Sequence, residues 1–469
     1  MLPQNGLPFI KEYISSINTV LQQKDPGVAL SRLQCAWITF VLMGIMITNS
    51  LCWSRFARFG LGRYQPAAMS WMFRKSQIVW SYVLEASVCH LLICYGITYG
   101  YLQLDDSDIQ RSKQTPRIAK THKVKDKKTN GFFNGQNILF LVLVAKDVTI
   151  PVGFRFYCPD PALTAWYKED KRLRAKKVKK QYRPVKPAEN PRYPSKKALA
   201  IELIQQFHRS FSHIKIHSIN ADLFYGTSEF MDGVLAIYPK SQVISQVKGG
   251  QLCSTQNKKS TLKELFQYYI GRKEQLSLRT QNKQVTYVSL ALKIKSHGKK
   301  YRVVACKYEG ETEFRYLIAT DMTWLAADII KAYSLRWLVE VFIQDWKTHA
   351  GWNQLAKQQG EIGSDRGVIL SLMADHALLL HGEQLDLYKT NQPACTVGSL
   401  KERVTIEALH QVIENIVLAD NPKAQLAEFA AKIEELFPLR QSAKHMRANL
   451  EEDITVSYTH LRAHETFAN

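Results

Sequence analysis

The residues of this sequence that are best suited to chemistry are acids at three places along the chain. Asp105 and Asp106 follow the strand-like run LQL, Asp222 follows the strand-like run SINA, and Glu340 lies in the apolar stretch YSLRWLVEVFIQDWK. If these carboxylates met, they would repel one another unless divalent cations lay between them, and oxygen ligands favour Mg²⁺ or Mn²⁺. Two such ions would activate a water or hydroxyl nucleophile and stabilise the leaving oxygen of a phosphodiester. Each acid taken alone is more simply explained as a solvated residue, so the prediction depends on their meeting in the fold.

The order of the predicted elements offers a way to bring these acids together. Three strand-like runs are followed by a helix and by a fourth strand that ends at Asp222. In a central mixed sheet, the ends of the first and fourth strands lie side by side if those strands are neighbours, and a helix packed across the sheet can bring Glu340 over them. The predicted elements are strands at 99–108, 137–146, 148–158 and 214–222 and a helix at 198–211.

The stretch YSLRWLVEVFIQDWK places four polar side chains along one side of an apolar helix. At about 100° per residue, Tyr333, Arg336, Glu340 and Lys347 fall within an arc of about 60°. A solvated face would explain the arc without chemistry, but such faces are usually wider and richer in Glu–Lys pairs. Arg, Lys and Tyr bind phosphate oxygens as a planar fork, a point charge and a hydrogen-bond donor. The pattern therefore favours a metal ligand flanked by phosphate contacts.

The other side of this helix is expected to be buried. The helix is predicted to begin between Asp321 and Thr323 and to run to about Gly351. Asp345 falls at about 120° on the same wheel, so it points away from the polar arc and is not assigned to the site. The apolar side chains on the buried side are Leu335, Leu338, Val339, Phe342 and Trp346.

The pattern Y-x2-R-x3-E-x6-K resembles the signature of a large family of DDE transposases from bacterial insertion sequences. The sequence matches it at all four positions, Tyr333, Arg336, Glu340 and Lys347. DDSD resembles the family's first-acid motif, in which the aspartate directly before Ser or Thr is the ligand, and this favours Asp106 over Asp105. NADLFYG resembles the second-acid motif and gives Asp222. The resemblance extends from about residue 43 to about residue 446.

The resemblance implies an α/β fold with a ribonuclease-H-like catalytic core, a β-rich insertion, and flanking N- and C-terminal helical regions. It implies a transposase that cleaves DNA at transposon ends and transfers the strand into target DNA, with two Mg²⁺ ions for which Mn²⁺ can substitute. The implied catalytic residues and metal ligands are Asp106, Asp222 and Glu340. The implied DNA-binding residues near the scissile phosphate are Tyr333, Arg336 and Lys347.

The implied partners are double-stranded DNA, in the form of terminal inverted repeats and target DNA, and a second copy of the chain. A homodimer on DNA is expected because two ends are joined in one event. The expected location is the bacterial cytoplasm, on the nucleoid when DNA is bound, with no membrane partner. Some relatives stack a flipped base on a tryptophan of the β insertion, but residues 224–323 contain no Trp. Stacking there would fall to Phe314 or Tyr316, so the sequence does not decide whether a hairpin forms.

The overall composition agrees with a nucleic-acid partner. The 469 residues are 46% hydrophobic, which excludes wholesale disorder, and they carry a formal net charge of +22. Such an excess indicates a polyanion, nucleic acid first and an anionic membrane surface second. Basic runs at 111–128 and 168–197 would follow DNA phosphates, although solvated loops would account for part of them. The eight cysteines form neither a CxxC pair nor a zinc-finger spacing, as expected for a reducing cytosol.

Changes in hydrophobic period divide the chain into predicted parts. The uncharged stretch 36–53 is at the lower length limit of a membrane span and is better explained as a buried helix. The run VLAIYP is predicted to be a strand, and residues 168–197 a surface loop. The run VSYTHLRAHET looks like a translated library adaptor.

The predicted parts of the chain are 1–95 (helical DNA-binding domain), 96–223 (first part of the core), 224–322 (β-rich insertion), 323–400 (second part of the core), 401–455 (C-terminal helical region) and 456–469 (artefact tail).

Other functions stay open at this point. An inactive or truncated transposase-derived protein would bind DNA without cleaving it. Another ribonuclease-H-like nuclease would share the acids but would not need the whole Tyr-Arg-Glu-Lys set. A membrane protein would rest on residues 36–53 alone.

Overall fold

The computed structural model describes the chain except for residues 1–5, 112–116, 127–128, 147, 256–257, 270, 279–282, 352–357 and 440–469. Two units can be separated along the chain, Met1–Asn415 and Ile416–Asn469. The predicted artefact tail at 456–469 and the last part of the predicted helical region at 401–455 lie outside the described residues.

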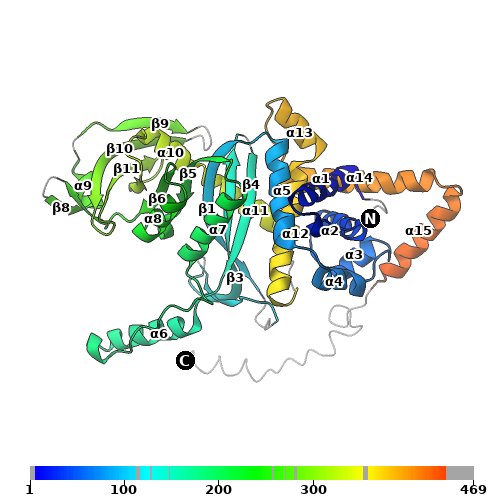
Figure 1. Ribbon diagram of the computed structural model, residues 1–469, viewed down its shortest axis with the longest axis horizontal. Helices are drawn as coiled ribbons and strands as arrows, with labels where there is room; N and C mark the ends of the chain where they lie inside the picture. The colour runs from blue at the N-terminus through cyan, green and yellow to red at the C-terminus, as the bar shows by residue number, and fades with distance from the viewer. Residues whose placement is uncertain are drawn as a thin grey trace, which may run out of the picture. The chain divides into compact units, whose positions relative to one another are not determined.

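The first 95 residues are helical, as the sequence predicts (Figure 1). Helix α2 contains most of the uncharged stretch, and its N-cap, Ser31, forms a reciprocal capping box with Gln34. Most of its side chains from Trp37 onward are buried. In the part of the chain that the structure describes, no single helix is long and apolar enough to cross a membrane, whereas two bent helix pairs pass by length and composition alone. The elements are α1 Pro8–Lys24, η1 Pro26–Val28, α2 Arg32–Thr48, α3 Trp53–Phe59, α4 Pro66–Lys75 and α5 Trp80–Cys94.

One mixed sheet runs through the larger unit in the order β2-β3-β1-β5-β6-β12-β11-β10-β7-β8, with β4 also paired to β3 and β9 to β10. Strand β1 is parallel to β5, and β5 is parallel to β6, whereas β3 is antiparallel to β1. The first and fourth of the predicted strands are therefore neighbours, which is the condition for their ends to lie side by side. The strands are β1 Tyr99–Gln110, β2 His122–Lys125, β3 Phe132–Ala145, β4 Val148–Tyr157, β5 Lys215–Ala221, β6 Gln242–Val247, β7 Leu252–Thr255, β8 Lys258–Thr261, β9 Glu274–Leu278, β10 Lys283–Ile294, β11 Lys300–Tyr308 and β12 Arg315–Ala319.

The predicted β-rich insertion continues the same sheet. Strand β6 pairs with β5 on one side and with β12 on the other, so the hydrogen-bonding ladder has no break between core and insertion. The run VLAIYP, predicted to be a strand, instead ends the helix α8 Ser228–Ile237, which buries Phe230, Met231 and Val234. A short apolar run fits a strand and a buried helix equally well, and here tertiary packing decides. A further short helix, α9, spans Leu262–Gln267.

Helices cover the two faces of the sheet around β1 and β3 (Figure 1). On one face, the ring of Phe140 in β3 lies 5.5 Å from that of Phe342 and 4.8 Å from that of Trp346, both in α11 Trp337–His349. On the other face, Arg155 in β4 binds Glu202 of α7 Lys196–Ser210 at 3.0 Å. The side chains of a strand alternate between faces, so each residue of β1 faces either α11 or α7.

The helix predicted from about 321 to 351 is broken. It forms α10 Ala326–Ser334 and α11, with Leu335 and Arg336 between them. The predicted start is also wrong, because the Asp321 carboxylate accepts the Thr323 backbone N–H at 2.9 Å and closes a turn ahead of the helix. The remaining helices are α12 Gly360–Leu379, α13 Gly382–Lys389, α14 Val397–Val417 and α15 Pro422–Leu436.

The basic segment predicted to be a loop begins as a helix. Helix α6 spans Pro161–Ala175 and starts with Pro161 in its first turn, where the Asp160 carboxylate accepts the backbone N–H of Ala162 at 2.8 Å. Lys, Arg and Ala are strong helix formers, so the charge did not prevent helix formation. A single 3₁₀ turn, η2 Lys180–Tyr182, follows before α7 begins.

A chain of buried polar side chains ties the N-terminal helices to the sheet. The Tyr13 hydroxyl lies 2.5 Å from Ser87 Oγ, Ser87 Oγ lies 2.6 Å from His376 Nδ1, and His376 Nε2 lies 2.9 Å from the Pro151 carbonyl oxygen. Burial lowers the pKa of His376 to about 4, so its imidazole is neutral at pH 7. These helices therefore share a core with the sheet instead of forming a separate one.

The neighbouring Asp375 gives the fold a specific pH dependence. Burial raises the pKa of its carboxyl to about 7, and the charge of Asp345 raises it further, against about 3.9 in the unfolded chain. Between about pH 4 and pH 7 the folded state retains a proton that the unfolded state releases, so the free energy of unfolding falls as pH rises. Asp375→Asn is expected to raise that free energy at pH 8 by about 2–4 kcal/mol and to leave it nearly unchanged at pH 4, as measured by urea unfolding.

The exposed Asp386 provides the matched control. Its side chain is 76% exposed, so Asp386→Asn should change the free energy of unfolding by less than about 0.5 kcal/mol at either pH. Equal effects of Asp375→Asn at pH 8 and pH 4 would contradict the assignment. His376 contributes to the pH dependence of stability with the opposite sign. Comparing the variant with wild type at one pH cancels this contribution, because both proteins contain His376.

Candidate active site

Asp105 and Asp222 lie side by side where the parallel strands β1 and β5 meet. Leu104 is paired with Ala221, so the next residues along the two strands are neighbours. Asp222 directly follows the last paired residue of β5, and both aspartates line the same cavity. The Asp222 carboxylate accepts the backbone N–H of Phe224 at 2.9 Å and thereby caps the 3₁₀ turn η3 Leu223–Tyr225.

The structure brings Asp105 rather than Asp106 to the helix that carries Glu340. Asp105 is paired with Phe140, which packs against α11, so its carboxylate points to the α11 face. Asp106 points to the opposite face, where its carboxylate accepts hydrogen bonds from Asn137 Nδ2 and Lys196 Nζ, each at 2.7 Å. The DDSD motif favours Asp106, whereas the contact with Arg336 on the α11 face favours Asp105 as the acid next to Glu340. The physical reason is the alternation of side chains along β1.

Arg336 joins the first acid to the third. Its Nη1 lies 2.6 Å from Asp105 Oδ2, and its Nη2 lies 2.5 Å from Glu340 Oε1. Both nitrogens belong to one planar guanidinium, so the two carboxylate oxygens are at most about 7.5 Å apart. One guanidinium thus connects an acid of β1 with an acid of α11.

These side chains line one cavity of about 530 Å³. Lys347 reaches into it and donates to the Asp108 carbonyl oxygen at 2.8 Å. Asp345 is not part of the lining, as the helical wheel predicts. Tyr333 is also absent from the lining and is only 6% exposed, because it lies on α10 before the break and packs in the core. The lining is Asp105, Asp106, Ser107, Asp222, Arg336, Glu340, Ile343, Gln344, Lys347 and Thr348.

The electrostatics of the cavity disfavour a charged Asp105. Burial raises the pKa of Asp105 to about 6, although the guanidinium of Arg336 lowers it, and the charge of Asp222 adds to the rise. Burial opposes the charge of Arg336, but Asp105, Tyr333 and Glu340 raise its pKa above the ordinary value. Burial also raises the pKa of Tyr333 to about 12. A carboxyl with a perturbed pKa in a cleft beside other acids is typical of a functional site.

Sequence patterns did not identify two neighbours of the acids. Lys196, the first residue of α7, binds Asp106 and places its ammonium 5.9 Å from the centre of the Phe224 ring. Tyr225 is completely buried, and its hydroxyl has no hydrogen-bond partner within the described residues. Burial raises the pKa of Tyr225, and Asp106, Asp222 and Asp105 raise it further, which places the phenol close to all three acids. Its position directly after the NADLF run is the one signal in the sequence that points to it.

The donors of the cavity suit a hard divalent cation. Asp105, Asp222 and Glu340 offer only oxygen atoms, which Mg²⁺ and Mn²⁺ prefer. Across the described residues, no group of three or more His, Cys, Asp and Glu side chains is close enough to hold a metal ion. At this site the guanidinium of Arg336 bridges two of the acids and supplies the positive charge. The donor atoms therefore suit such an ion in type, whereas in the described residues the carboxylates are not close enough together to form one binding group.

The aromatic side chains named for base stacking in the insertion are not equally accessible. Tyr316 is 6% exposed and its ring lies 5.8 Å from that of Phe266. Phe314 is partly buried against the main core. Tyr316 cannot stack on a base in this arrangement.

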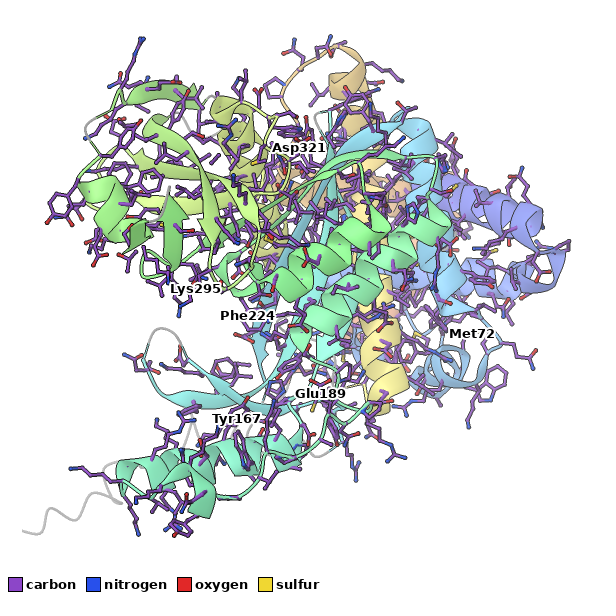
Figure 2. All side chains as sticks on the ribbon, turned by 60° about the vertical axis from the view of Figure 1, so that its left-hand side comes forward. Met72, Tyr167, Glu189, Phe224, Lys295 and Asp321 are labelled. Atoms are coloured by element: carbon purple, nitrogen blue, oxygen red, sulfur yellow. The ribbon has the colours of Figure 1, made fainter. Side chains whose placement is uncertain are left out.

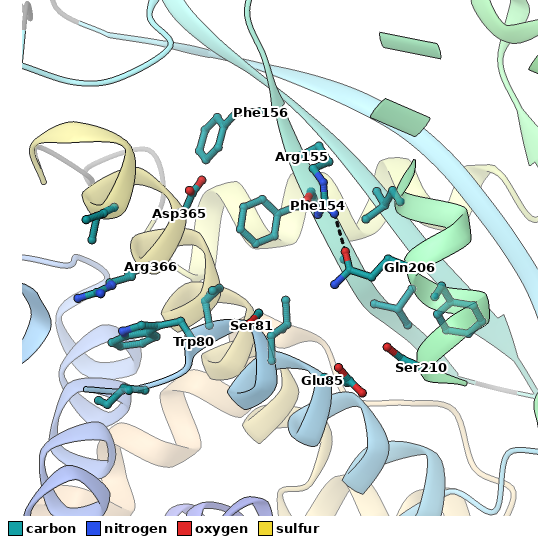
Figure 3. A pocket seen from close by; sticks show the side chains of 18 of the residues that line it. Trp80, Ser81, Glu85, Phe154, Arg155, Phe156, Gln206, Ser210, Asp365 and Arg366 are labelled. Atoms are coloured by element: carbon teal, nitrogen blue, oxygen red, sulfur yellow. Dashed lines mark hydrogen bonds between the residues drawn. The ribbon is translucent and has the colours of Figure 1, made fainter. Parts of the chain in front are cut away.

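A separate cavity of about 500 Å³ lies between α5, β4, α7 and α12 (Figure 3). Its walls include Trp80 and Phe154, and its polar groups include Arg155, which donates to Gln206 at 2.5 Å. None of the acids predicted from the sequence lines it, so it is not part of the candidate site.

Comparisons with known proteins find similarity in structure alone. No protein-family model matches the chain, and no curated protein matches it. Among solved structures, the chain is similar to the piggyBac transposase in a synaptic complex with hairpin DNA, with 10% sequence identity and a TM-score of 0.42 over 96% of this chain and 86% of that one. A likeness at that distance carries no argument about activity, so the function has to follow from the residues of the chain itself.

Proposed function

We propose that this chain is a DDE transposase, which cleaves DNA at transposon ends and transfers the strand into target DNA. The observation that supports this most is the meeting of Asp105 and Asp222, on adjacent parallel strands, with Glu340 from α11 in one cavity. The match to the Y-x2-R-x3-E-x6-K signature adds to it. A ribonuclease-H-like core is part of the same proposal.

The proposed metal ligands are Asp105, Asp222 and Glu340, with Asp105 in place of Asp106. When bound, two Mg²⁺ ions, or Mn²⁺ as a substitute, supply a Lewis acid for in-line phosphoryl transfer. The chain's own residues hold the DNA. Arg336 would grip a phosphate with its planar fork, and Lys347 would add a point charge. Tyr333, which is buried behind Arg336, would position that guanidinium instead of touching DNA.

The proposed partners follow from charge and from the reaction. A net charge of +22 favours double-stranded DNA, both as terminal repeats and as target. Joining two ends in one event favours a homodimer assembled on DNA. The proposed setting is the cytoplasm of a bacterial cell, on the nucleoid.

The test uses DNA from the two flanks of the coding sequence. We expect Mg²⁺ or Mn²⁺ to support strand cleavage and EDTA to abolish it, because the acids act through the ions. Asp222→Ala and Glu340→Ala should each lower the cleavage rate by about 1,000-fold or more, with DNA affinity within about fivefold of wild type. Equal cleavage by wild type and variants would refute the site. Binding of the flanks without cleavage by any of the proteins would instead favour a DNA-binding protein that lacks catalysis.

A further inference from the structure

Residues 161–195 form an arm that consists of α6 and the segment that returns from it to α7 (Figure 1). Figure 2 shows Tyr167 and Glu189 on this arm, away from the strands of the insertion. All but one of the residues of α6 are at least partly exposed, and the buried one is Asp170. Because α6 buries so little of its own surface, most of its side chains are free to contact a partner.

The arm has a defined internal structure. Asp170, whose side chain is 8% exposed, binds Arg174 in its own helix and Arg183 in the returning segment, each at 2.8 Å. Trp166 Nε1 donates to the Pro184 carbonyl oxygen at 2.7 Å. These contacts hold the returning segment against α6, so the basic side chains around them are presented by a folded element and not by a free loop.

The charge of the arm is strongly positive. Its 35 residues contain eleven Lys or Arg and three Asp or Glu, which is +8 of the chain's net +22. Two of its three acids already bind arginines of the arm, Glu169 to Arg172 and Asp170 to Arg174 and Arg183. Within the described residues, seven exposed lysines of the arm take part in no ion pair, and they include Lys171, Lys176, Lys179 and Lys180.

The arm is rooted at the candidate active site. It leaves from the end of β4 and returns to Ser195, the N-cap of α7. The next residue, Lys196, binds Asp106, which lines the cavity, and lies 5.2 Å from the centre of the Tyr157 ring at the end of β4. A polymer held in the cavity would therefore have the root of the arm beside it.

We propose that the arm is a second DNA-binding element, which holds the phosphate backbone of the duplex next to the scissile bond without reading its sequence. This inference rests on the proposed function, because it takes the cavity to be the cleavage site. Helix α6, with 15 residues, is about 22 Å long, so it can follow about six base pairs at about 3.4 Å each. Lysine side chains bind phosphates as point charges and carry no base information.

The test measures the salt dependence of binding to a generic duplex in EDTA, so that no cleavage occurs. In the arm variant, Lys171, Lys176, Lys179 and Lys180 are each changed to Gln. We expect affinity at 0.1 M salt to fall at least about tenfold and the slope of log K against log [salt] to decrease by up to about 3.6, because each of the four lost phosphate contacts removes about 0.9. The footprint on the duplex should shorten on one flank.

The matched control removes the same charge from exposed lysines of the insertion, with Lys240, Lys283, Lys293 and Lys300 changed to Gln. For this control variant, the slope of log K against log [salt] should stay within about 1 of the wild-type slope. Circular dichroism and thermal unfolding verify that both variants fold. Equal slopes for the arm and control variants would overturn the role of the arm while leaving the proposed cleavage intact. If wild type did not bind duplex DNA, or bound anionic lipid vesicles more tightly, both proposals would fail.

Discussion

Asp105→Asn is expected to lower the rate of Mg²⁺-dependent strand cleavage by about 1,000-fold or more, whereas Asp106→Asn should lower it by no more than about 100-fold. The reason is the pairing of β1 with its neighbours. Asp105 points to α11 and binds Arg336, and Asp106 points to α7, where it binds Asn137 and Lys196. Loss of a metal ligand abolishes binding of the ion, whereas loss of a residue that only contacts a ligand weakens that binding. Single-turnover cleavage of a labelled duplex measures both rates.

The two substitutions form a matched pair, because each replaces one carboxylate of the same strand by an isosteric amide. A larger loss for Asp106→Asn than for Asp105→Asn would show that the DDSD motif, and not the geometry of the strand, identifies the ligand. DNA affinity should stay within about fivefold for both variants, so that the difference in rate reports on catalysis.

Trp346→Ala is expected to have the largest effect on stability, about 3–5 kcal/mol, because it empties a large volume in the core. Trp346 is completely buried, with its ring 4.8 Å from that of Phe140, and its Nε1 donates to Ser371 Oγ at 2.9 Å. This side chain fixes α11, and with it Glu340, on the sheet. We therefore expect cleavage to fall along with the free energy of unfolding, measured by urea denaturation.

Trp346→Phe is the control for that prediction. It keeps most of the ring packing and loses the hydrogen bond to Ser371, so the expected loss is about 1–2 kcal/mol. If Trp346→Ala were no more destabilising than Trp346→Phe, α11 would be held on the sheet by other contacts, and the account of how Glu340 is positioned would be wrong.

The sequence predicted the parts of the site that depend on local pattern. The apolar runs of β1, β3, β4 and β5 and the helical phase of α11 were visible in residue types alone, and they led to Asp222, Arg336, Glu340 and Lys347. From Arg336 onward, the side chains keep the helical phase that the sequence predicts, in spite of the break after α10. Tyr333 lies before the break, so the wheel did not describe its surroundings.

The choice between Asp105 and Asp106 could not be made from the sequence. It depends on which face of β1 is covered by α11, and that is decided by contacts such as Phe140 with Trp346, which join residues far apart in the chain. The arm was missed for a different reason. Its lysines and prolines are typical of a loop, whereas the contacts of Asp170 with Arg183 and of Trp166 with Pro184 that fold it are tertiary.

The most direct test of the central claim, that Asp105 is a metal ligand of a DNA-cleaving site, is a metal switch. In Asp105→Cys a soft sulfur replaces a hard oxygen, and thiolates bind Mg²⁺ poorly but accept softer transition metals better. We predict no cleavage by Asp105→Cys in Mg²⁺ and partial recovery in Mn²⁺, measured against wild type in both ions. Asp105→Cys that is as active as wild type in Mg²⁺, or that gains nothing from Mn²⁺ while Asp106→Cys does, would contradict the account.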